Sequence, residues 1–422
     1  MHSSDSGTVH IIGAGLAGLA AAVRLTMSRR PIAIHEATMY PGGRCRTYHD
    51  QTTGMSIDNG THLVLSGNHA ALSFVTTIGS EGQLQGPPKA EFPFVDLASK
   101  AKWKLRFGDG RIPWWIFDKD RRAPQTGVAD YMPLARLIWT STDKPIGQVI
   151  NCAGPMYERF IGPFLLAALN IAPREGSAKL ASVLVRETLA LGGKACRPLL
   201  ARDGIGNAFV EPAIRYLRGR STITFQDELL ALRFAGQHVS RLEFTKQTVM
   251  LGEDDVVILA VPPYMAATFV PGLRTPSAFR GIVNAHFRID PPNRLPPMLG
   301  IVNGTCEWIF SHPGRISVTI SDADRLFDMP RMELAQTIWR EVAAVAGLSE
   351  TLPPWQIVRE RRATFAATPE QNAMRPEAQT AWRNLFLAGD WTATGLPATL
   401  ESAIRSGYRA GDLISDSLQV AA

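Results

Sequence analysis

Three glycines near the start of the chain stand at the spacing of a phosphate-binding turn. The pattern G-x-G-x-x-G is formed by Gly13, Ala14, Gly15, Leu16, Ala17 and Gly18. The first glycine permits a tight turn, the second lets the backbone approach a pyrophosphate, and the third lets a helix pack closely on a strand. Glu36, followed by Ala37, comes about 20 residues further on, where an acidic side chain can bond the ribose of a dinucleotide.

The elements expected around these glycines supply the context that an isolated motif lacks. Residues 8–12 read as a short apolar strand, residues 16–28 as a helix of small residues, and residues 31–36 as a second strand. Such a βαβ unit implies a parallel sheet. The N-terminus of its helix presents free N–H groups and a partial positive charge to phosphates. We therefore predict that this segment binds a dinucleotide.

Two further segments favour FAD over NAD. Gly42, Gly43 and Arg44 can form a second loop against the pyrophosphate, with the guanidinium on a phosphate. Near the other end of the chain, a predicted strand ends in Gly389-Asp390, and Pro397 is expected to start a helix. The N-terminus of that helix can stabilise negative charge at the N1–C2=O edge of a reduced flavin.

The three segments together predict bound FAD. Attachment is expected to be non-covalent, because no Cys or His occupies an obvious attachment motif, although Cys45 lies close to the second loop.

In this chain order the segments resemble those of the amine oxidase and phytoene desaturase superfamily of flavoproteins. The resemblance implies that Glu36 contacts the adenosine ribose, that Arg44 lies near the pyrophosphate, and that Asp390 lies near the ribityl chain or the pyrophosphate. It also implies that one turn lies beside the isoalloxazine ring, with Pro397, Ala398, Thr399 and Leu400 in it.

Within this superfamily the chain resembles the hydroxysqualene dehydroxylases of bacterial hopanoid pathways. The likeness is carried by residues 58–65, 164–173, 209–213, 389–392 and 396–403. Relatives carry Asn-Gly-Gln-His in a loop that the resemblance places at the flavin. This chain has Asn59, Gly60, Thr61 and His62 there, which leaves the role of Thr61 open. The resemblance implies that reduced FAD gives a hydride to an allylic C30 alcohol, that water leaves, and that squalene forms.

That reaction needs a proton donor for the departing hydroxyl, an apolar site that excludes water, and close approach of flavin and substrate. His62 is the first candidate donor, because imidazole titrates near neutral pH; the alternative is an ordinary hydrogen-bonded histidine. Asp58 can instead cap backbone near the ring. Asn170 can orient the hydroxyl or simply end a helix. Tyr157 and Glu401 are weaker candidates, and sequence spacing does not choose among them.

The predicted fold is α/β. It consists of a Rossmann-like FAD-binding domain of the glutathione reductase type, interleaved with a mixed α+β substrate domain. With 422 residues the chain is too long for one ordinary domain. From the alternation of sequence character, we expect the FAD-binding domain over residues 1–85, 207–265 and 375–422. The substrate domain is expected over residues 86–206 and 266–374.

Composition limits the partners. A net charge of +6 is too modest to indicate nucleic-acid binding. The four cysteines are scattered, which predicts free thiols, a reducing compartment and no metal site. The first residues lack the apolar core of a signal peptide, so a cytoplasmic location is expected. No apolar run reaches the roughly 18 residues that a spanning helix needs.

Residues 100–122 nevertheless predict a peripheral membrane contact. Four aromatic residues, Trp103, Trp114, Trp115 and Phe117, lie among lysines and arginines, and tryptophan beside cations is typical of an interfacial anchor. The alternatives are a solvated charged face with tryptophans in the core, or an edge strand of the substrate-domain sheet. The hydrocarbon substrate favours the membrane, at the inner face of the cytoplasmic membrane.

Other functions stay open on sequence alone. The flavin could run in the oxidative direction, as in a carotenoid-type desaturase or an amine oxidase, for which Trp391 could contribute to an aromatic cage. A non-catalytic prenyl-binding escort is a third possibility, although it has no need of a complete flavin site. The electron donor is open as well. No second glycine motif marks a nicotinamide site, so free NAD(P)H or a partner reductase would both serve.

Overall fold

A five-stranded parallel sheet holds the N-terminal glycine turn. The computed structural model describes residues 7–28 and 30–421, with side chains described as far as residue 415. The sheet order is β10-β2-β1-β14-β20, and every neighbouring pair is parallel. Its strands are β1 (Val9–Ile12), β2 (Ile32–Glu36), β10 (Thr222–Phe225), β14 (Val256–Leu259) and β20 (Leu385–Leu387). Strands β1 and β14 are short apolar runs buried along nearly their whole length, as inner strands of a parallel sheet should be.

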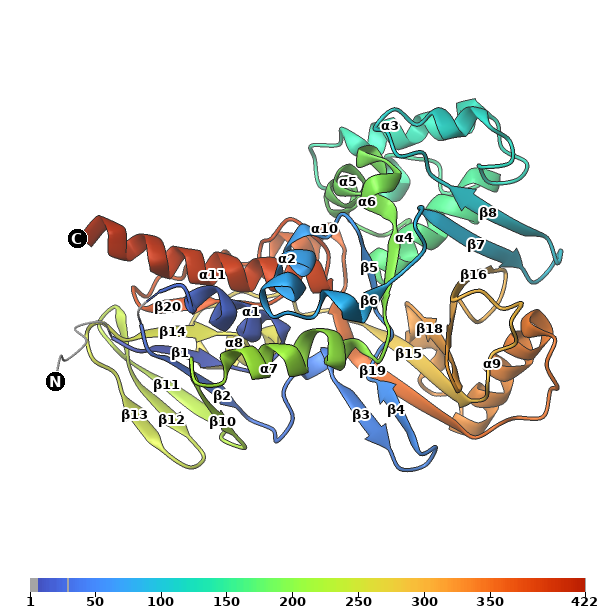
Figure 1. Cartoon of the computed structure of the whole chain (residues 1–422). Coiled ribbons are helices and arrows are strands. Elements are labelled where there is room, and N and C mark those ends of the chain that lie inside the picture. Colours follow the sequence, from blue (N-terminus) through green and yellow to red (C-terminus); the bar gives the residue numbers. More distant parts are fainter. Residues whose placement is uncertain (1–6, 29, 422) are drawn as a thin grey trace.

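Two helices from opposite ends of the chain lie against each other over this sheet (Figure 1). Helix α1 (Leu16–Leu25) follows the glycine turn, and α11 (Leu400–Ala421) closes the chain. Their close approach depends on Gly407, because a Cβ there would stand 2.2 Å from the carbonyl oxygen of Ala17. Helices α2 (His69–Thr77) and α7 (Glu211–Leu217) also contact this pair.

A mixed seven-stranded sheet forms the second half of the molecule, with the order β19-β15-β18-β17-β16-β7-β8. Its strands are β7 (Glu91–Asp96), β8 (Lys102–Arg106), β15 (Phe279–Arg288), β16 (Met298–Val302), β17 (Trp308–His312), β18 (Arg315–Ile320) and β19 (Trp355–Phe365). Helix α9 (Arg331–Ala346) packs against it through a buried face that includes Trp339.

Between β8 and the next strand of the chain, the polypeptide forms a helical lobe over residues 107–197 (Figure 1). Its helices are α3 (Met132–Ile138), α4 (Gly162–Leu169), α5 (Ala178–Glu187) and α6 (Gly193–Cys196). A small antiparallel sheet, β5-β9-β6, joins the lobe to the rest. It consists of β5 (Leu63–Leu65), β6 (Leu84–Gln85) and β9 (Pro198–Ala201).

The remaining elements complete the α/β fold. An antiparallel hairpin and a three-stranded meander account for the other strands, namely β3 (Thr47–Asp50), β4 (Met55–Asp58), β11 (Leu229–Ala235), β12 (His238–Phe244) and β13 (Thr248–Met250). The two short helices are α8 (Pro263–Phe269) and α10 (Pro369–Ala373).

The predicted fold class is confirmed. The parallel sheet takes strands from residues 9–36, 222–259 and 385–387, while the seven-stranded sheet takes them from 91–106 and 279–365, so the two halves are interleaved along the chain. The domain boundaries given above stay predictions. Residues 221–232 belong to two sheets, because the chain turns at Gln226 with a φ of 57°.

Two predictions concern sequence features outside these sheets. The expected lack of a signal peptide rests on the first residues, of which 1–6 lie outside the described part of the chain. Within the described residues, no helix is both long enough and apolar enough to cross a bilayer.

Candidate active site

The glycine turn between β1 and α1 has the geometry that a pyrophosphate requires. Gly13 has a φ of 105°, and its N–H donates to the carbonyl of His35 at 2.7 Å. A Cβ on Gly18 would stand 2.0 Å from the oxygen of Gly13, so helix and strand are as close as the motif implies. At Gly15, by contrast, no atom lies within 4 Å of a Cβ position. The open side of the turn is therefore at Gly15, while Leu16 and Ala17 are buried in the first turn of α1.

Glu36 lies at the end of β2 and faces this turn. One carboxylate oxygen accepts a hydrogen bond from the N–H of Ala14 at 2.8 Å, and the other accepts one from the N–H of Thr38 at 2.9 Å. The carboxylate is therefore held beside the glycines, where a ribose would be bonded, whereas Ala37 is exposed.

The second loop lies directly against the first. The N–H of Gly42 donates to the carbonyl of Ala14 at 2.8 Å, and Gly42 and Gly43 have φ values of 102° and 54°. Arg44 then reaches the C-terminal segment, where its Nη2 lies 2.7 Å from Oδ1 of Asp390. Two of the predicted cofactor segments thus meet in an ion pair that links residues 346 positions apart. Burial lowers the pKa of Arg44, but the charge of Asp390 and its hydrogen bond, with Glu360 further off, together outweigh burial and raise it above the ordinary value.

Cys45 follows this arginine and is buried. Burial raises the pKa of its thiol to about 12. Since the thiolate is the nucleophilic form of cysteine, this thiol is poorly suited to attack a flavin ring, in keeping with the expected non-covalent attachment.

The loop of Asn59, Gly60, Thr61 and His62 lies beside Arg44 and against β15. The amide group of Asn284 holds it from the β15 side, accepting from the N–H of Thr61 and donating to the carbonyl of Asn59, at 3.4 and 3.3 Å. Within the described chain, Oγ1 of Thr61 is buried and has no hydrogen-bond partner. A buried, unpaired hydroxyl is free to bond a molecule that occupies the site.

His62 does not have the properties expected of a proton donor at neutral pH. Burial and then the charge of Arg44 lower its pKa to about 4, while a hydrogen bond to the backbone of Arg44 acts in the other direction. At pH 7 the imidazole is neutral, and its single N–H is directed to the Arg44 carbonyl. The geometry fits the alternative stated above, a hydrogen-bonded histidine that fixes the second loop.

The C-terminal segment forms a tight turn that leads into α11. The N–H of Gly389 donates to Oγ of Ser406 at 2.8 Å. The helix begins at Leu400 and not at Pro397, because Thr399 is its N-cap, with Oγ1 accepting from the N–H of Ser402 at 3.1 Å. Pro397 and Ala398 belong to the turn that precedes the helix. A residue whose side chain caps the first N–H groups defines a helix start more strongly than a proline does.

Arg375 is a buried residue of this region that sequence reasoning missed. Its guanidinium donates to Oγ1 of Thr394 at 3.0 Å and to the carbonyl of Asp390 at 3.2 Å, and it also bonds the carbonyl of Thr392. Burial lowers its pKa to about 10. It therefore stays charged and fixes the turn that carries Asp390. Nothing in the local sequence marks it, because the turn that it fixes lies 15 to 19 residues further along the chain and is contacted mainly through carbonyl groups.

Two other catalytic candidates, Asp58 and Asn170, make hydrogen bonds within the protein. Asp58 is 3% exposed and accepts from Thr47 Oγ1 and from the N–H of Ile205, so it caps backbone as the alternative anticipated. Asn170 ends α4 with a φ of 51°, and its amide nitrogen donates to Arg280 and Thr364. With both amide hydrogens engaged, Asn170 fits the second alternative given above, a residue that ends a helix.

Glu401 and Tyr157 also differ from the predicted roles. The carboxylate of Glu401 accepts from the N–H groups of Ala70 and Ala71 and pairs with Arg405, so it caps α2. Tyr157 lies beside Cys152, and burial raises its pKa, which makes it a weaker acid than an ordinary tyrosine.

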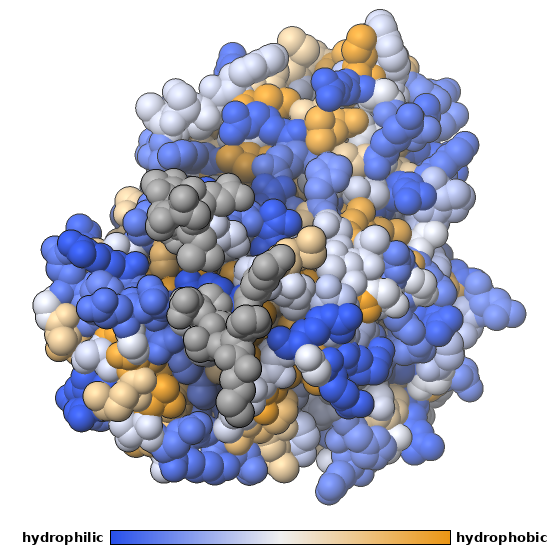
Figure 2. Space-filling view, turned by 60° about the vertical axis from the view of Figure 1, so that its left-hand side comes forward, coloured by the Kyte–Doolittle hydropathy of each residue, from blue (hydrophilic) through white to orange (hydrophobic). Residues whose placement is uncertain are grey.

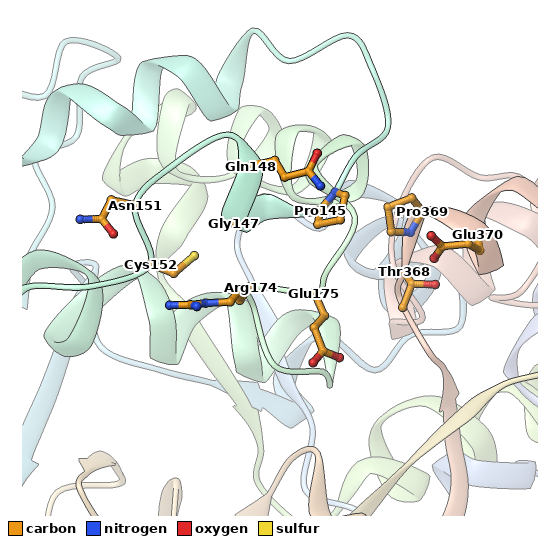
Figure 3. A pocket seen from close by; sticks show the side chains of 10 residues that line it. All are labelled: Pro145, Gly147, Gln148, Asn151, Cys152, Arg174, Glu175, Thr368, Pro369 and Glu370. Carbon is orange, nitrogen blue, oxygen red and sulfur yellow. The ribbon is translucent and has the colours of Figure 1, made fainter.

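Cys152 opens onto a groove of about 680 Å³ between the helical lobe and the start of α10 (Figure 3). Its lining includes the polar side chains of Gln148, Asn151, Arg174 and Glu370. None of the predicted cofactor residues lines it, so it is separate from the site described here. Among the described residues, no cluster of His, Cys, Asp and Glu could hold a metal ion.

The residues present fit FAD on two independent observations. Only glycine fits at Gly13 and Gly18 without a clash, yet the space beside Gly15 is clear of protein atoms, which is the cradle that a pyrophosphate needs. An acid, an arginine and a second acid (Glu36, Arg44 and Asp390) are brought to this cradle from three distant segments.

Comparison with known proteins gives the family. The model of the family described as "Flavin containing amine oxidoreductase" matches residues 16–415. The chain belongs to this family. As a flavin-containing amine oxidoreductase it is an FAD-dependent enzyme.

Named relatives of this flavin-containing amine oxidoreductase are very similar along their whole length. A hydroxysqualene dehydroxylase from Rhodopseudomonas palustris is 56% identical, with 97% of this chain and 98% of the relative covered. One from Sinorhizobium fredii is 53% identical, with 96% and 97% covered. Among solved structures, cyclohexylamine oxidase from Brevibacterium oxydans has a TM-score of 0.72 at 14% identity, covering 98% of this chain and all of that one, and this likeness concerns the fold.

Proposed function

We propose that the protein is a hydroxysqualene dehydroxylase, which reduces the allylic C30 alcohol hydroxysqualene to squalene in squalene and hopanoid biosynthesis. The observation that carries this proposal is the identity of 56% and 53%, over nearly the whole of both chains, with two proteins of that name. The FAD cradle at Gly15, Glu36, Arg44 and Asp390 supports it, because a reductive reaction needs a bound hydride carrier.

In the reaction the C–O bond of the alcohol breaks and a C–H bond forms at the same carbon. The hydroxyl takes up a proton and leaves as water. When bound and reduced, FAD supplies the hydride and is oxidised by two electrons. Gly15 and Arg44 would hold its pyrophosphate and Glu36 its adenosine ribose, while the turn before α11 would lie at the ring.

The Thr61 hydroxyl is the group that we place on the departing oxygen. It is buried without a protein partner, and it follows Gly60 in the loop that His62 and Asn284 fix. A hydrogen bond from this hydroxyl would favour loss of water. His62, neutral at pH 7, would position the loop and not donate the proton itself.

The rival functions fit the site less well. An amine oxidase would use an aromatic cage, but Trp391 is 2% exposed and its ring N–H donates to the carbonyl of Val261 at 3.0 Å. A prenyl-binding escort would not need the full set of cofactor residues. A carotenoid-type desaturase differs mainly in the direction of hydride transfer, which a product analysis decides.

We also place the enzyme as a peripheral protein at the inner face of the cytoplasmic membrane, because a C30 isoprenoid alcohol dissolves in lipid and not in water. The reductant that restores reduced FAD would be free NAD(P)H or a partner reductase.

The test is a product analysis in heavy water. The purified holoenzyme is reduced with dithionite under argon in D₂O, given hydroxysqualene, and extracted for mass spectrometry. We expect squalene with one deuterium at the carbon that lost the hydroxyl, because the hydride of reduced flavin exchanges with solvent. Recovery of unchanged alcohol, together with dehydrogenation of a polyene or an amine by the oxidised enzyme, would contradict the proposal.

A further inference from the structure

Five large apolar side chains of the helical lobe are exposed to solvent. Their exposed fractions run from 60% to 78%, for Ile112, Trp114, Phe117, Met132 and Trp139. They come from two successive pieces of chain: residues 112–117, which end in a short helical turn, and α3 with the residue that caps its C-terminus. We refer to these five residues as the Trp114–Trp139 surface.

Buried neighbours bring these two pieces together. The rings of Trp115 and Tyr131 meet edge to face with centroids 5.5 Å apart, and both side chains are buried. Trp114 directly precedes Trp115 in the chain, and Met132 directly follows Tyr131. The rings of Trp114 and Phe117 lie 5.9 Å apart. The exposed aromatic groups and the start of α3 are therefore on one side of the lobe.

Helix α3 continues the surface along its outer face. Met132, Arg136 and Trp139 are all exposed, and their spacing of four and three residues puts them on one stripe of a helix. Leu137, on the opposite side, is fully buried, and α3 contacts α5. The apolar stripe thus faces away from the core. The lobe lies at the top of Figure 1, beside β7 and β8 and away from the parallel sheet, and Figure 2 shows hydrophobic side chains among hydrophilic ones at the top of the molecule.

The charge around the surface is strongly positive. Residues 97–139 contain nine basic and four acidic side chains, a net charge of +5, against +6 for the whole chain. Six of the basic residues are exposed, namely Lys100, Lys102, Arg106, Arg111, Lys119 and Arg136. About a tenth of the chain therefore carries most of its net charge, next to its exposed tryptophans.

We propose that the Trp114–Trp139 surface inserts into the interface of an anionic lipid bilayer. Tryptophan is favoured at the level of the headgroups, and a basic rim is attracted to anionic lipid. Tryptophan, phenylalanine and methionine are also enriched at protein–protein interfaces. The net charge of +5 on residues 97–139 favours a surface of anionic lipid headgroups as the partner. The inference deepens the proposed function, since a substrate dissolved in lipid has to be met at its surface.

This surface differs from the one that residues 100–122 predicted. Trp115 is buried in an aromatic cluster with Phe107 and Phe160, and Trp103 stacks on Phe94 at 5.5 Å with nearly parallel rings. Two of the four expected aromatic contacts therefore belong to the core, and the second part of the surface comes from α3, outside the expected segment.

The test is co-sedimentation of the holoenzyme with vesicles of phosphatidylcholine alone or mixed with phosphatidylglycerol. We expect binding to the mixed vesicles that weakens with added salt, and at least tenfold weaker partitioning for a Trp114→Ala, Trp139→Ala double variant. Met27 and Met250, 86% and 68% exposed on the FAD-binding half, give a matched control, and their double alanine variant should bind like the wild type.

Activity on hydroxysqualene in detergent shows whether the double variant is folded, and it should equal that of the wild type. Failure of the wild type to bind mixed vesicles, or equal binding by the tryptophan variant, would overturn the inference. So would sedimentation velocity showing that these tryptophans hold two copies of the chain together. Vesicle binding that depends on the tryptophans in a protein without dehydroxylase activity would uphold the inference and reject the proposed function.

Discussion

At the scale of single residues, a substitution at Gly15 should weaken cofactor binding without lowering the stability of the protein. Apart from its two chain neighbours, no residue in the described part of the chain has an atom within 4 Å of a Cβ there, and its φ of −70° suits any residue. We expect Gly15→Ala to change the free energy of unfolding of the FAD-free protein by less than about 0.5 kcal/mol. The dissociation constant for FAD should rise at least tenfold, or ~1.4 kcal/mol, because the methyl group enters the space of the pyrophosphate.

Flavin fluorescence titration and urea unfolding measure the two quantities. Gly82→Ala is the matched control. Among the described residues, no atom lies within 4 Å of a Cβ at Gly82 either, and Gly82 lies far along the chain from the glycine turn. An unchanged FAD affinity in Gly15→Ala would place the pyrophosphate elsewhere.

Thr61 carries the second prediction at this scale. Replacing its unpaired buried hydroxyl by a methyl group in Thr61→Val should leave stability unchanged or raise it by about 1 kcal/mol. We expect kcat for hydroxysqualene to fall by roughly a hundredfold if the hydroxyl bonds the departing oxygen, and Thr61→Ser to retain most of the activity. Equal rates for the valine and serine variants would mean that the hydroxyl takes no part.

The site shows which residues a sequence can reveal. Gly13, Gly15, Gly18 and Glu36 act within one short βαβ unit, so their spacing predicts their positions. Asn284 and Arg375 could not be found in this way. Asn284 acts from β15 on a loop 225 residues away, and Arg375 acts from the segment after α10 on a turn 15 to 19 residues away, and only the fold makes these segments neighbours. The neutral state of His62 also depends on burial and on Arg44, neither of which its local sequence contains.

At the scale of elements, the contact between α1 and α11 is the most sensitive to volume. A Cβ on Gly407 would stand 2.2 Å from the carbonyl oxygen of Ala17 and 2.8 Å from the backbone nitrogen of Ala21. We expect Gly407→Ala to lower the free energy of unfolding by about 1–3 kcal/mol, since backbone must move. FAD affinity should fall as well, because α11 begins next to the predicted flavin turn.

Gly411, one turn further along α11, provides the control. A Cβ there meets only the flexible side chain of Arg24 at 3.1 Å or more and a backbone oxygen at 3.6 Å. Gly411→Ala should be neutral or stabilising by up to about 1 kcal/mol, from helix propensity. Equal destabilisation by the two substitutions would show that the helices do not depend on close contact at Gly407.

Sequence patterns predicted the elements unevenly. The apolar strand before Gly13 and the periodic helix after Gly15 agree with the structure because their own residues determine them. The start of α11 was misplaced by three residues, since the cap is made by Thr399 and the proline lies in the preceding turn. The split of residues 221–232 between two sheets follows from a positive φ at Gln226, which no residue pattern indicated.

At the scale of the whole molecule, buried histidines predict loss of stability in acid. Burial is the largest cause that lowers the pKa of His35 and His312 to about 4 and that of His286 to about 3, from 6.5. Below pH 6.5 the unfolded chain therefore binds protons that the folded chain does not, and stability falls as pH decreases towards 4.

Glu307 acts in the opposite direction, because burial raises its pKa to about 7. His62 adds a fourth such histidine, because its pKa is also lowered to about 4. With four histidines against one carboxyl group, we expect a net loss of roughly 3 kcal/mol per pH unit between pH 6.5 and 5. Urea unfolding midpoints of the holoenzyme measure it, and His312→Gln should reduce the slope. Constant midpoints over this range would show that these histidines are not held neutral by the fold.

The central claim is that reduced FAD transfers a hydride to hydroxysqualene. A single-turnover reaction tests this claim most directly. The flavin of the holoenzyme is fully reduced by two electrons, and excess reductant is removed under argon. The reduced enzyme is then mixed with hydroxysqualene while the flavin absorbance is followed. We predict full reoxidation with one squalene formed per flavin. A flavin that stays reduced while hydroxysqualene persists would contradict the account.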